Sequence, residues 1–384
     1  MQNEIHIDGL GHGGEGLGRI DGEVCFIPGA LPGDTVRVGE IQRRKGVARA
    51  RVEEIVSPSP HRQAVECPVF GECGGCNWLH FAYPAQREWK QKIVRDCLRR
   101  IGGIEVEVGY VEEPSLQFGY RTRATFHGDG TNWGFYKAGS HKVVDLENCP
   151  LCHPHLKRAY ARLRTLRFSG SVELTVNPEG DDVLVWSDTP HAELRECFPE
   201  AQSGGDGGKR TSFSFDGVPV INGAFSQSSL LLNRNLRETV HGMLGGVESL
   251  LDLYCGAGNF SRAYCESSEV VGIDNDGVSV MAADRNGPGE YRVGDEKAMK
   301  LAIEERVWDA ILLDPPRTGG RKLSRALAKA QAGRIVYVSC DPATLARDAR
   351  ALIDGGWKLD RAVMVDMFPH TAHIETVCLF IRPS

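Results

Sequence analysis

The sequence lacks a long apolar segment, and none of its hydrophobic runs approaches the roughly 20 residues that a membrane-spanning helix needs. Its first residues, Met-Gln-Asn-Glu-Ile-His, show no signal-peptide pattern. We therefore expect no membrane association and a cytoplasmic, reducing location. Disulfide bonds are rare under such conditions, so the 12 cysteines are expected to be free thiols, metal ligands or catalysts.

The chain also lacks an excess of positive charge. Its formal net charge is −6 over 384 residues, so any nucleic-acid binding must come from local basic patches. No internal repeat is visible. The length predicts two or three domains, and the 41% of hydrophobic residues can supply a sizeable core.

Residues 1–58 are predicted to form a small all-β domain. Short alternating runs separated by glycine-rich turns are typical of a barrel of the OB kind. A basic run at 43–45, with Arg49 and Arg51 nearby, contacts a nucleic-acid backbone or is only a solvated face.

A cluster of cysteines follows this region. Three thiols lie within ten residues, at Cys67, Cys73 and Cys76. Such spacing in a cytosolic protein indicates a metal centre, and Cys149 is the natural fourth ligand, with Cys152 or His153 as substitutes. Zinc sites are commonly built from paired C-x2-C hooks, so three clustered cysteines with a distant fourth favour a [4Fe–4S] cluster over zinc.

The central region, residues 59–220, combines a helix and a sheet. Residues 81–101 read as an amphipathic helix with an excess of cations, and Arg121 and Arg123 beside Tyr120 suit phosphate contact and stacking or an ordinary ion-paired strand. Alternating runs after residue 124 predict an antiparallel sheet. A polar segment at 203–210 reads as a hairpin loop or linker.

From residue 221 to 384 strands alternate with helices, which predicts a doubly wound α/β domain. The candidate strands are 248–253, 269–273, 309–313, 334–338 and 375–381, and two of the candidate helices are 323–332 and 342–354. Ligands of such folds bind at the carboxyl ends of the strands.

The stretch Leu-Asp-Leu-Tyr-Cys-Gly-Ala-Gly-Asn-Phe at 251–260 joins a strand to a helix-compatible segment. Glycines at 256 and 258 allow the backbone to approach a ligand, and Asp274, at the end of the next strand, suits a ribose diol. Together they favour a nucleoside cofactor over a plain strand–helix connection.

Three further strand ends carry reactive groups. Asp314 precedes two rigid prolines and can hold a flat base or an amino group. Cys340 directly precedes a helix that begins at Pro342, so its pKa is expected to be lowered by the helix dipole, unless it is only a buried structural cysteine. Glu375 is a candidate proton acceptor.

A thiolate, a carboxylate base and a methyl-donor pocket make one reaction coherent. Carbon 5 of uracil becomes nucleophilic when a thiolate adds to carbon 6, because an enolate forms. That carbon can attack a sulfonium methyl group. Glu375 would then remove the carbon-5 proton so that the Cys340 thiol is eliminated.

With these motifs in this order, the chain resembles the RNA uracil-C5 methyltransferase family, which makes 5-methyluridine in ribosomal or transfer RNA. The resemblance covers nearly the whole chain. The motifs that carry it are Leu31-Pro32-Gly33-Asp34, the four cysteines, Phe225-Ser226-Gln227, the loop at 252–260, Asp314-Pro315-Pro316, Ser339-Cys340 and Pro369-His370-Thr371-x-His373-x-Glu375.

The resemblance implies three units: an OB-like TRAM β-barrel (1–58), a central α+β domain that holds an iron–sulfur cluster and binds RNA (59–220), and a Rossmann-like class I methyltransferase domain (221–384). It implies Cys340 as nucleophile and Glu375 as base. The S-adenosylmethionine site would use Gln227, Tyr254, Asn259, Asp274, Asp295 and Asp314. Cys67, Cys73, Cys76 and Cys149 would hold a [4Fe–4S] cluster that supports folding and RNA binding.

Three alternatives remain open. Asp-Pro-Pro also occurs in amino-methyltransferases, which need no cysteine, and a non-catalytic iron–sulfur RNA-binding protein would use only the barrel and the cluster. Within the uracil-C5 family, a barrel together with a cluster favours 23S ribosomal RNA as the target, with transfer RNA second. No obligate protein partner is implied.

Overall fold

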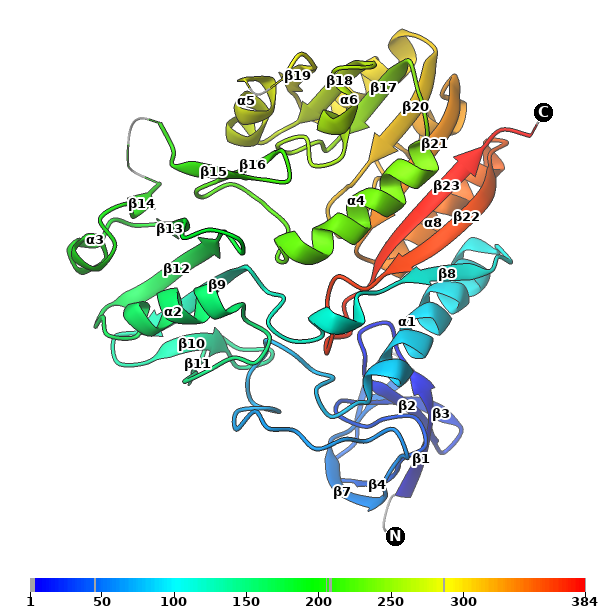
Figure 1. Ribbon diagram of the computed structural model, residues 1–384. Helices are drawn as coiled ribbons and strands as arrows, with labels where there is room; N and C mark the ends of the chain where they lie inside the picture. The colour runs from blue at the N-terminus through cyan, green and yellow to red at the C-terminus, as the bar shows by residue number, and fades with distance from the viewer. Residues whose placement is uncertain (1–3, 45, 205, 207–208, 286, 384) are drawn as a thin grey trace.

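The computed structural model describes residues 4–44, 46–204, 206, 209–285 and 287–383 (Figure 1). Lys45 of the basic run, and residues 205, 207 and 208 of the loop predicted at 203–210, therefore lie outside the described residues. The described strands form sheets of seven, six, two and eight strands. Among the helices of this described part, none is long and apolar enough to cross a membrane.

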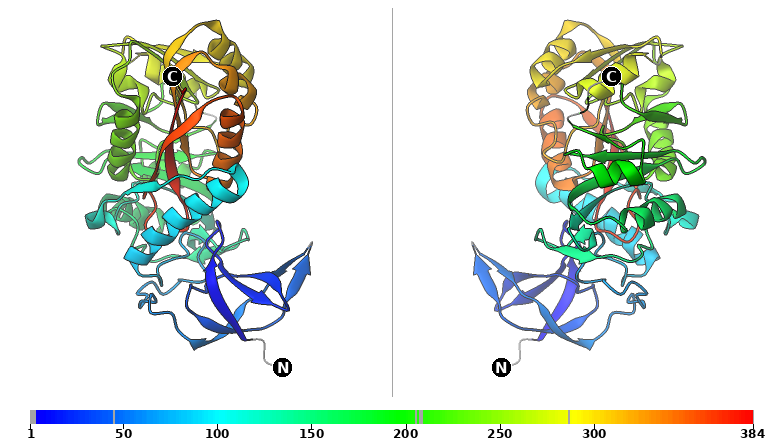
Figure 2. Two further views of the ribbon diagram at one scale, coloured as in Figure 1. Left: turned by 90° about the vertical axis from the view of Figure 1, so that its right-hand side faces the viewer. Right: turned by 90° about the vertical axis from the view of Figure 1, so that its left-hand side faces the viewer.

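The seven-stranded sheet occupies the N-terminal region and protrudes from the rest of the molecule (Figure 2). Its strands are β1 (Glu4–Leu10), β2 (Gly16–Ile20), β3 (Glu23–Ile27), β4 (Thr35–Val38), β5 (Gln42–Arg44), β6 (Val47–Arg49) and β7 (Val52–Ser57). Alternation sets the faces: Ile5 and Ile7 are buried, whereas Glu4 and His6 are exposed. This agrees with the predicted all-β unit.

Part of the basic run is neutralised within this sheet. Arg43 pairs with Asp21 at 2.7 Å and with Glu23 at 3.1 Å, and Arg49 lies 3.4 Å from Glu15. Exposed pairs of this kind contribute little to stability, and they reduce the positive charge available to a phosphate backbone.

The six-stranded sheet has the order β11-β10-β9-β12-β13-β14 and packs against two helices. Its elements are β9 (Arg123–Asp129), β10 (Trp133–Tyr136), β11 (Val143–Asp145), β12 (Ser169–Val176), β13 (Val183–Ser187), β14 (Gln202–Ser203), α2 (Pro154–Leu163) and α3 (Ala192–Cys197). A separate hairpin, β15 (Ser212–Phe215) and β16 (Val218–Ile221), follows it. The sheet is antiparallel except for the short β13–β14 pair.

The eight-stranded sheet has the order β19-β18-β17-β20-β21-β23-β22-β8. Its C-terminal strands are β17 (Ser249–Leu253), β18 (Glu269–Asp274), β19 (Glu290–Val293), β20 (Trp308–Leu313), β21 (Ala332–Ser339), β22 (Lys358–Val365) and β23 (Glu375–Ile381). The five predicted strands are confirmed. The sequence reading missed β19, which has only one buried side chain, and β22, and it did not foresee that β23 runs antiparallel between β21 and β22.

One segment joins a different unit from the one predicted. Helix α1 (Tyr83–Cys97), which continues as a π turn at Leu98–Gly102, and strand β8 (Val108–Val111) fall within the predicted central domain. The structure pairs β8 in parallel with β22 and packs α1 beside it (Figure 1). The C-terminal sheet is therefore completed by residues that precede the central sheet in the chain.

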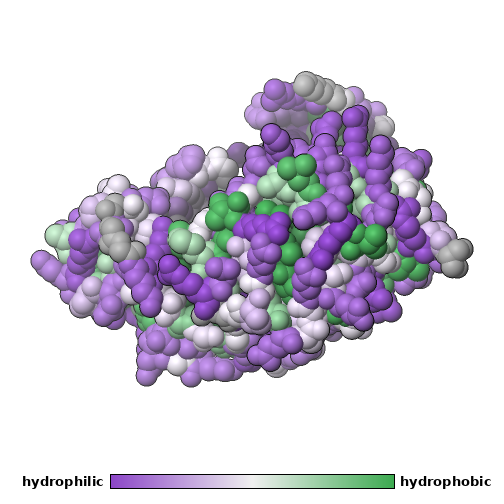
Figure 3. Space-filling model, turned by 90° about the horizontal axis from the view of Figure 1, so that it is seen from above, coloured by the Kyte–Doolittle hydropathy of each residue, from purple (hydrophilic) through white to green (hydrophobic). Residues whose placement is uncertain are grey.

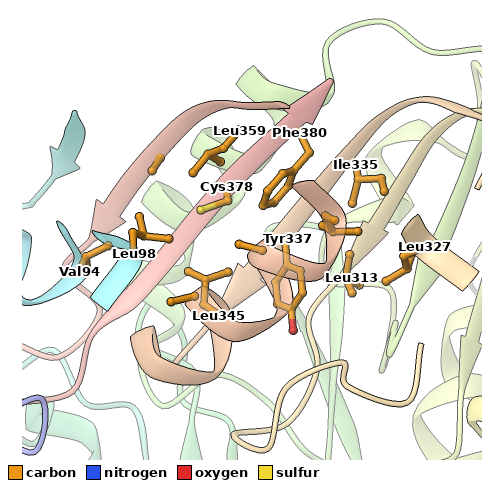
Figure 4. Packing of buried hydrophobic residues seen from close by; sticks show 14 of the residues in the cluster. Val94, Leu98, Leu313, Leu327, Ile335, Tyr337, Leu345, Leu359, Cys378 and Phe380 are labelled. Atoms are coloured by element: carbon orange, nitrogen blue, oxygen red, sulfur yellow. The ribbon is translucent and has the colours of Figure 1, made fainter. Parts of the chain in front are cut away.

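Helices cover both faces of this sheet. They are α4 (Leu230–Leu244), α5 (Gly277–Arg285), α6 (Glu296–Glu305), α7 (Ser324–Lys329) and α8 (Pro342–Asp354). One core contains residues of α1, α6, α7 and α8, and Figure 4 shows Leu345 of α8 and Leu327 of α7 around Tyr337 of β21. The other core contains residues of α4 and α5. Seen from above, the molecule presents mostly hydrophilic side chains with hydrophobic ones gathered near the middle (Figure 3).

Candidate active site

Strand pairing brings the predicted nucleophile and base together. Strands β21 and β23 are antiparallel, with Ser339 opposite Thr376. Cys340 follows Ser339 and Glu375 precedes Thr376, so the two side chains lie at the same edge of the sheet. Electrostatic coupling between them supports this proximity, since Glu375 raises the pKa of Cys340.

The expectation of a lowered pKa at Cys340 is wrong for the protein alone. Burial of the thiol, together with the carboxylates of Glu375 and Asp314, raises the pKa of Cys340 to about 11, and Arg317 only partly opposes this. The helix offers little compensation because Asp341 caps it, accepting hydrogen bonds from the first-turn amides of Ala343 and Thr344.

Glu375 is a buried carboxyl group in the same environment. Its exposed fraction is 4%, and burial and the charge of Asp314 raise its pKa well above the usual range, against a lowering by Arg317. Burial therefore favours the neutral form of this group more than it would at the protein surface. A carboxylate of raised pKa is also the stronger base once it has lost its proton.

These pKa shifts predict a pH-dependent thiol. Only the thiolate reacts with iodoacetamide, so the alkylation rate of Cys340 should rise about tenfold for each pH unit between about pH 7 and 9. Mass spectrometry of the Cys340 peptide measures the rate, and Cys340→Ser identifies that peptide. A rate that is flat over this range would mean that the thiolate already exists at pH 7 and would contradict the raised pKa.

The loop after β17 forms a cradle of backbone. Tyr254, Gly256 and Gly258 have positive φ values of 59°, 53° and 78°. A Cβ atom at Gly258 would lie 2.9 Å from the hydroxyl oxygen of Tyr291, so glycine is needed there. The Asp274 carboxylate accepts a hydrogen bond from Gly256 N at 2.9 Å and thereby fixes the loop against the end of β18.

Three carboxyl groups surround this loop. Burial and the neighbouring charges of Asp314 and Asp274 raise the pKa of Asp252 to about 7, and burial and the charge of Asp274 raise that of Asp314 to about 7. The side chain of Asp252 is buried, and both of its carboxylate oxygens lack a well-formed hydrogen bond within the described part of the chain, although Ser261 lies near enough to lower its pKa. Such a group suits a cationic ligand.

Asp252 was not among the predicted cofactor residues. The signal was available, because a carboxylate inside the apolar strand β17 has no structural reason to be buried. S-adenosylmethionine carries a sulfonium and an amino group, both cationic. The donor set of Asp252, Asp274 and Asp314 therefore fits this cofactor.

Two other predicted cofactor residues, Asp295 and Asn259, follow strands β19 and β17 and lie at the same edge. Asp295 caps α6 by accepting hydrogen bonds from the amides of Lys297 and Ala298. The side chain of Asn259 exchanges two hydrogen bonds, of 2.7 and 3.1 Å, with that of Asn233 on α4. Gln227 lies half-buried in the segment between β16 and α4.

The four predicted metal ligands converge from two distant segments. The charges of Cys67, Cys73 and Cys149 each act on Cys76, and those of Cys67 and Cys149 act on Cys73. A hydrogen bond from the Cys152 thiol is the largest influence on Cys149 and lowers its pKa to about 6. A thiolate is the form that binds metal.

A cation lies among these thiols. The guanidinium of Arg121 interacts electrostatically with Cys76, Cys149 and Cys152, and it donates to Gly75 O at 3.4 Å. Arg121 therefore faces the cysteines, while Arg123 pairs with Glu173 at 2.6 Å. The sequence reading had offered both arginines as phosphate contacts or as part of an ordinary ion-paired strand, and the Arg123–Glu173 pair agrees with the second.

The described residues contain no group of three or more His, Cys, Asp or Glu side chains arranged around a single metal position. Cysteines that bind different iron atoms of a cluster stand further apart than ligands of one ion. Four thiols and one cation, whose charge would offset that of a cluster, are a donor set of the kind that a [4Fe–4S] cluster uses.

The fold and this site define a methyltransferase of RNA, and comparisons support that class. A family model described as tRNA (Uracil-5-)-methyltransferase matches residues 297–383, and the TRAM domain model matches residues 3–52. A crystal structure of the Pyrococcus abyssi tRNA (uracil-54, C5)-methyltransferase, in complex with S-adenosyl-L-homocysteine, matches with a TM-score of 0.78 and 25% identity. The match covers 98% of this chain and 99% of that one.

Curated relatives match over nearly their whole length. The 23S rRNA (uracil(1939)-C(5))-methyltransferase RlmD of Alkalilimnicola ehrlichii is 33% identical over 431 aligned residues, covering 99% of this chain and 97% of the relative. That of Methylococcus capsulatus is 31% identical over 443, covering 98% and 96%. The chain belongs to the RNA uracil-C5 methyltransferase family and is an S-adenosylmethionine-dependent enzyme with an N-terminal TRAM domain.

Proposed function

We propose that the protein methylates carbon 5 of a specific uridine in 23S ribosomal RNA, with Cys340 as nucleophile and Glu375 as base. The β21–β23 pairing carries this proposal, because it sets a thiol and a buried carboxyl group side by side at the edge that also holds the cofactor cradle. Relatives at 31–33% identity over nearly the whole chain bear 23S rRNA names, which supports the ribosomal target.

The reaction begins with addition of the Cys340 thiolate to carbon 6 of uracil, which places carbanion character on carbon 5. S-adenosylmethionine supplies an electrophilic methyl group when bound. Carbon 5 forms the new bond to that methyl carbon while the methyl–sulfur bond breaks, with S-adenosylhomocysteine as the leaving group. Carbon 5 then carries both a methyl group and a proton. The Glu375 carboxylate takes the proton, and the bonding electrons expel Cys340 from carbon 6.

Positive charge beside the buried acidic groups of the site favours their ionised forms. The positive charge of the cofactor would act in this way on Asp252, Asp274 and Asp314, and Arg317 favours the ionised forms of Cys340 and Glu375. Gln227, Tyr254, Asn259 and Asp295 would complete the cofactor site.

The same proposal gives the protein a [4Fe–4S] cluster on Cys67, Cys73, Cys76 and Cys149. The cluster would hold the segment at 67–76 against the start of the central sheet. Residues 1–58 would then serve RNA binding, and the unit predicted at 59–220 would serve cluster and RNA binding. The unit predicted at 221–384, which α1 and β8 join, would serve methyl transfer. Since ribosomal RNA is a cytoplasmic substrate, the expected location belongs with this proposal.

Anaerobically prepared protein should contain about four iron and four sulfide ions per chain. Cys76→Ser should lose most of the iron and the broad visible absorbance, because the Cys76 thiol lies close enough to the other three proposed ligands to interact with each of them. Cys197→Ser, which changes a half-buried cysteine of α3, is the matched control and should keep both. One zinc ion per chain without sulfide would contradict the cluster.

The target is tested by methylating matched substrates with tritiated S-adenosylmethionine. A 23S rRNA fragment that contains the uridine named in the relatives should yield 5-methyluridine, and a transfer RNA transcript should not. The transfer RNA is the second candidate, because the Pyrococcus abyssi protein of similar structure acts on it. Methylation of only the transfer RNA would overturn the ribosomal assignment and retain the chemistry.

A further inference from the structure

Helix α1 buries a stripe of polar side chains for which the reaction above has no use. Tyr83, Gln86 and Lys90 lie three and four residues apart and therefore share one face of the helix. Gln86 and Lys90 have no exposed surface, and Tyr83 is 7% exposed. The sequence reading had counted Lys90 only among the cations of an amphipathic helix at 81–101.

Burial of such groups calls for an explanation. A lysine removed from water loses hydration that a single ion pair does not fully restore, and apolar side chains of similar size would cover a sheet at least as well. All three side chains instead reach residues of one loop, 366–374, which leads from β22 to Glu375. Gln86 also donates to Trp78 O at 3.1 Å and to Phe81 O at 2.6 Å, so the stripe joins that loop to the segment after the third cysteine.

The polar contacts run along the loop in order. Lys90 Nζ lies 2.7 Å from Asp366 Oδ1 and donates to Phe368 O at 3.0 Å. The Tyr83 hydroxyl donates to Asp366 Oδ2 at 2.9 Å. Because side chains of α1 bind both oxygens of the buried Asp366 carboxylate, the start of the loop is fixed against α1.

The middle of the loop is held by Gln86. Its Oε1 accepts from His370 N at 2.9 Å, and its amide nitrogen lies 3.0 Å from His370 Nδ1. His370 has a φ of 63°, a left-handed conformation that a side chain adopts only at a cost in backbone strain. Gln86 therefore contacts both the backbone and the ring of His370, the strained residue.

The cysteine segment holds the same loop from the other side. Asn77, which follows Cys76, accepts from Ala372 N at 2.8 Å, and Trp78 N donates to His370 O at 3.0 Å. The loop is thus held between α1 and the residues just after the third cysteine, at positions three and five residues before the base.

We propose that Gln86, with Tyr83, Lys90 and Asn77, positions Glu375 for proton removal from carbon 5. These side chains are positioning residues, since they contact neither substrate nor reacting atoms and act through the loop. This inference rests on the proposed function. It states that the contacts of α1 with the loop set the rate of proton removal from carbon 5, the step that follows methyl transfer.

Displacement of Glu375 and a loss of stability have different effects on the amount of covalent protein–RNA complex. If Glu375 is misplaced, Cys340 still adds and carbon 5 still receives its methyl group, but elimination slows. Covalent protein–RNA complex should then accumulate on unmodified uracil RNA. A variant that is merely unstable forms less complex and turns over less.

The test compares Gln86→Met with Gln91→Met in the full, cluster-loaded chain. Both change a glutamine of α1 to a side chain of similar size, but Gln91 donates to Val108 O, away from the loop. Asn77→Ala is a second variant at an exposed position, which should fold normally. Complex on a denaturing gel, single-turnover rate, KM for RNA and cofactor affinity are measured for each, with Glu375→Gln as reference.

We expect Gln86→Met to lower kcat by about 10²-fold, the scale of a 1 Å displacement, with KM and cofactor affinity within about twofold. Complex should accumulate in Gln86→Met and Asn77→Ala and stay at the wild-type level in Gln91→Met. If Glu375→Gln accumulates complex and Gln86→Met and Asn77→Ala do not, the positioning proposal fails alone. If Glu375→Gln accumulates none, the assigned base and the positioning proposal fail together.

Discussion

Cys340→Ala should abolish methyl transfer to the 23S rRNA fragment, with a fall in rate of at least about 10⁴-fold, as expected when a nucleophile is removed. Without the Cys340 thiol, carbon 5 of uracil does not gain carbanion character. Tritium transfer under single-turnover conditions measures the loss.

Binding must survive for this result to identify a nucleophile. Cofactor affinity should stay within about twofold of wild type, because the carboxyl groups of the cradle are untouched. Cys197→Ala, which changes a half-buried cysteine on α3, should retain full activity. Substantial methylation by Cys340→Ala would remove the covalent mechanism and favour direct transfer, as in an amino-methyltransferase.

Glu375→Gln should slow turnover by about 10²- to 10⁴-fold, the usual contribution of a general base. The amide has the shape of the neutral carboxyl group that burial already favours, so the fold should persist. Since nucleophilic addition precedes proton removal, a methylated protein–RNA adduct should accumulate on unmodified RNA.

The adduct is measured on a denaturing gel with methyl-labelled cofactor. Label that migrates with the protein identifies an intermediate formed after methyl transfer and before elimination. Wild-type protein is the control and should show little of it. If Glu375→Gln is inactive and forms no adduct, the carboxyl group is needed before or during nucleophilic addition. Its role would then differ from that of the proposed base.

The sequence predicted which strand ends carry the reactive groups better than it predicted the surroundings of those groups. Glycines and acids that end apolar strands are readable because parallel strands present their carboxyl ends at one edge, and helix Pro342–Asp354 was predicted to the residue. The pKa of Cys340 was not readable. It depends on Glu375 and Asp314, which pairing between distant strands brings near.

Long-range packing also explains what was missed. Nothing local in residues 81–101 shows that α1 and β8 join the C-terminal sheet, because that requires pairing of β8 with a strand more than 200 residues away. Lys90 looks like a surface cation by composition, and only the position of Asp366 explains its burial. The cysteine pattern offered Cys149 as the natural fourth ligand, but it left Cys152 and His153 as substitutes, because only the folded chain shows which side chains approach Cys76.

The most direct test of the central claim is trapping with a 23S rRNA fragment in which the target uridine is replaced by 5-fluorouridine. Fluorine at carbon 5 cannot leave as a proton, so the enzyme should stop as a covalent complex that contains one transferred methyl group. Peptide mapping should place the RNA on Cys340, and Cys340→Ala should form no complex. A complex mapped to another residue, or methylation of unmodified RNA without any trapping, would contradict the account.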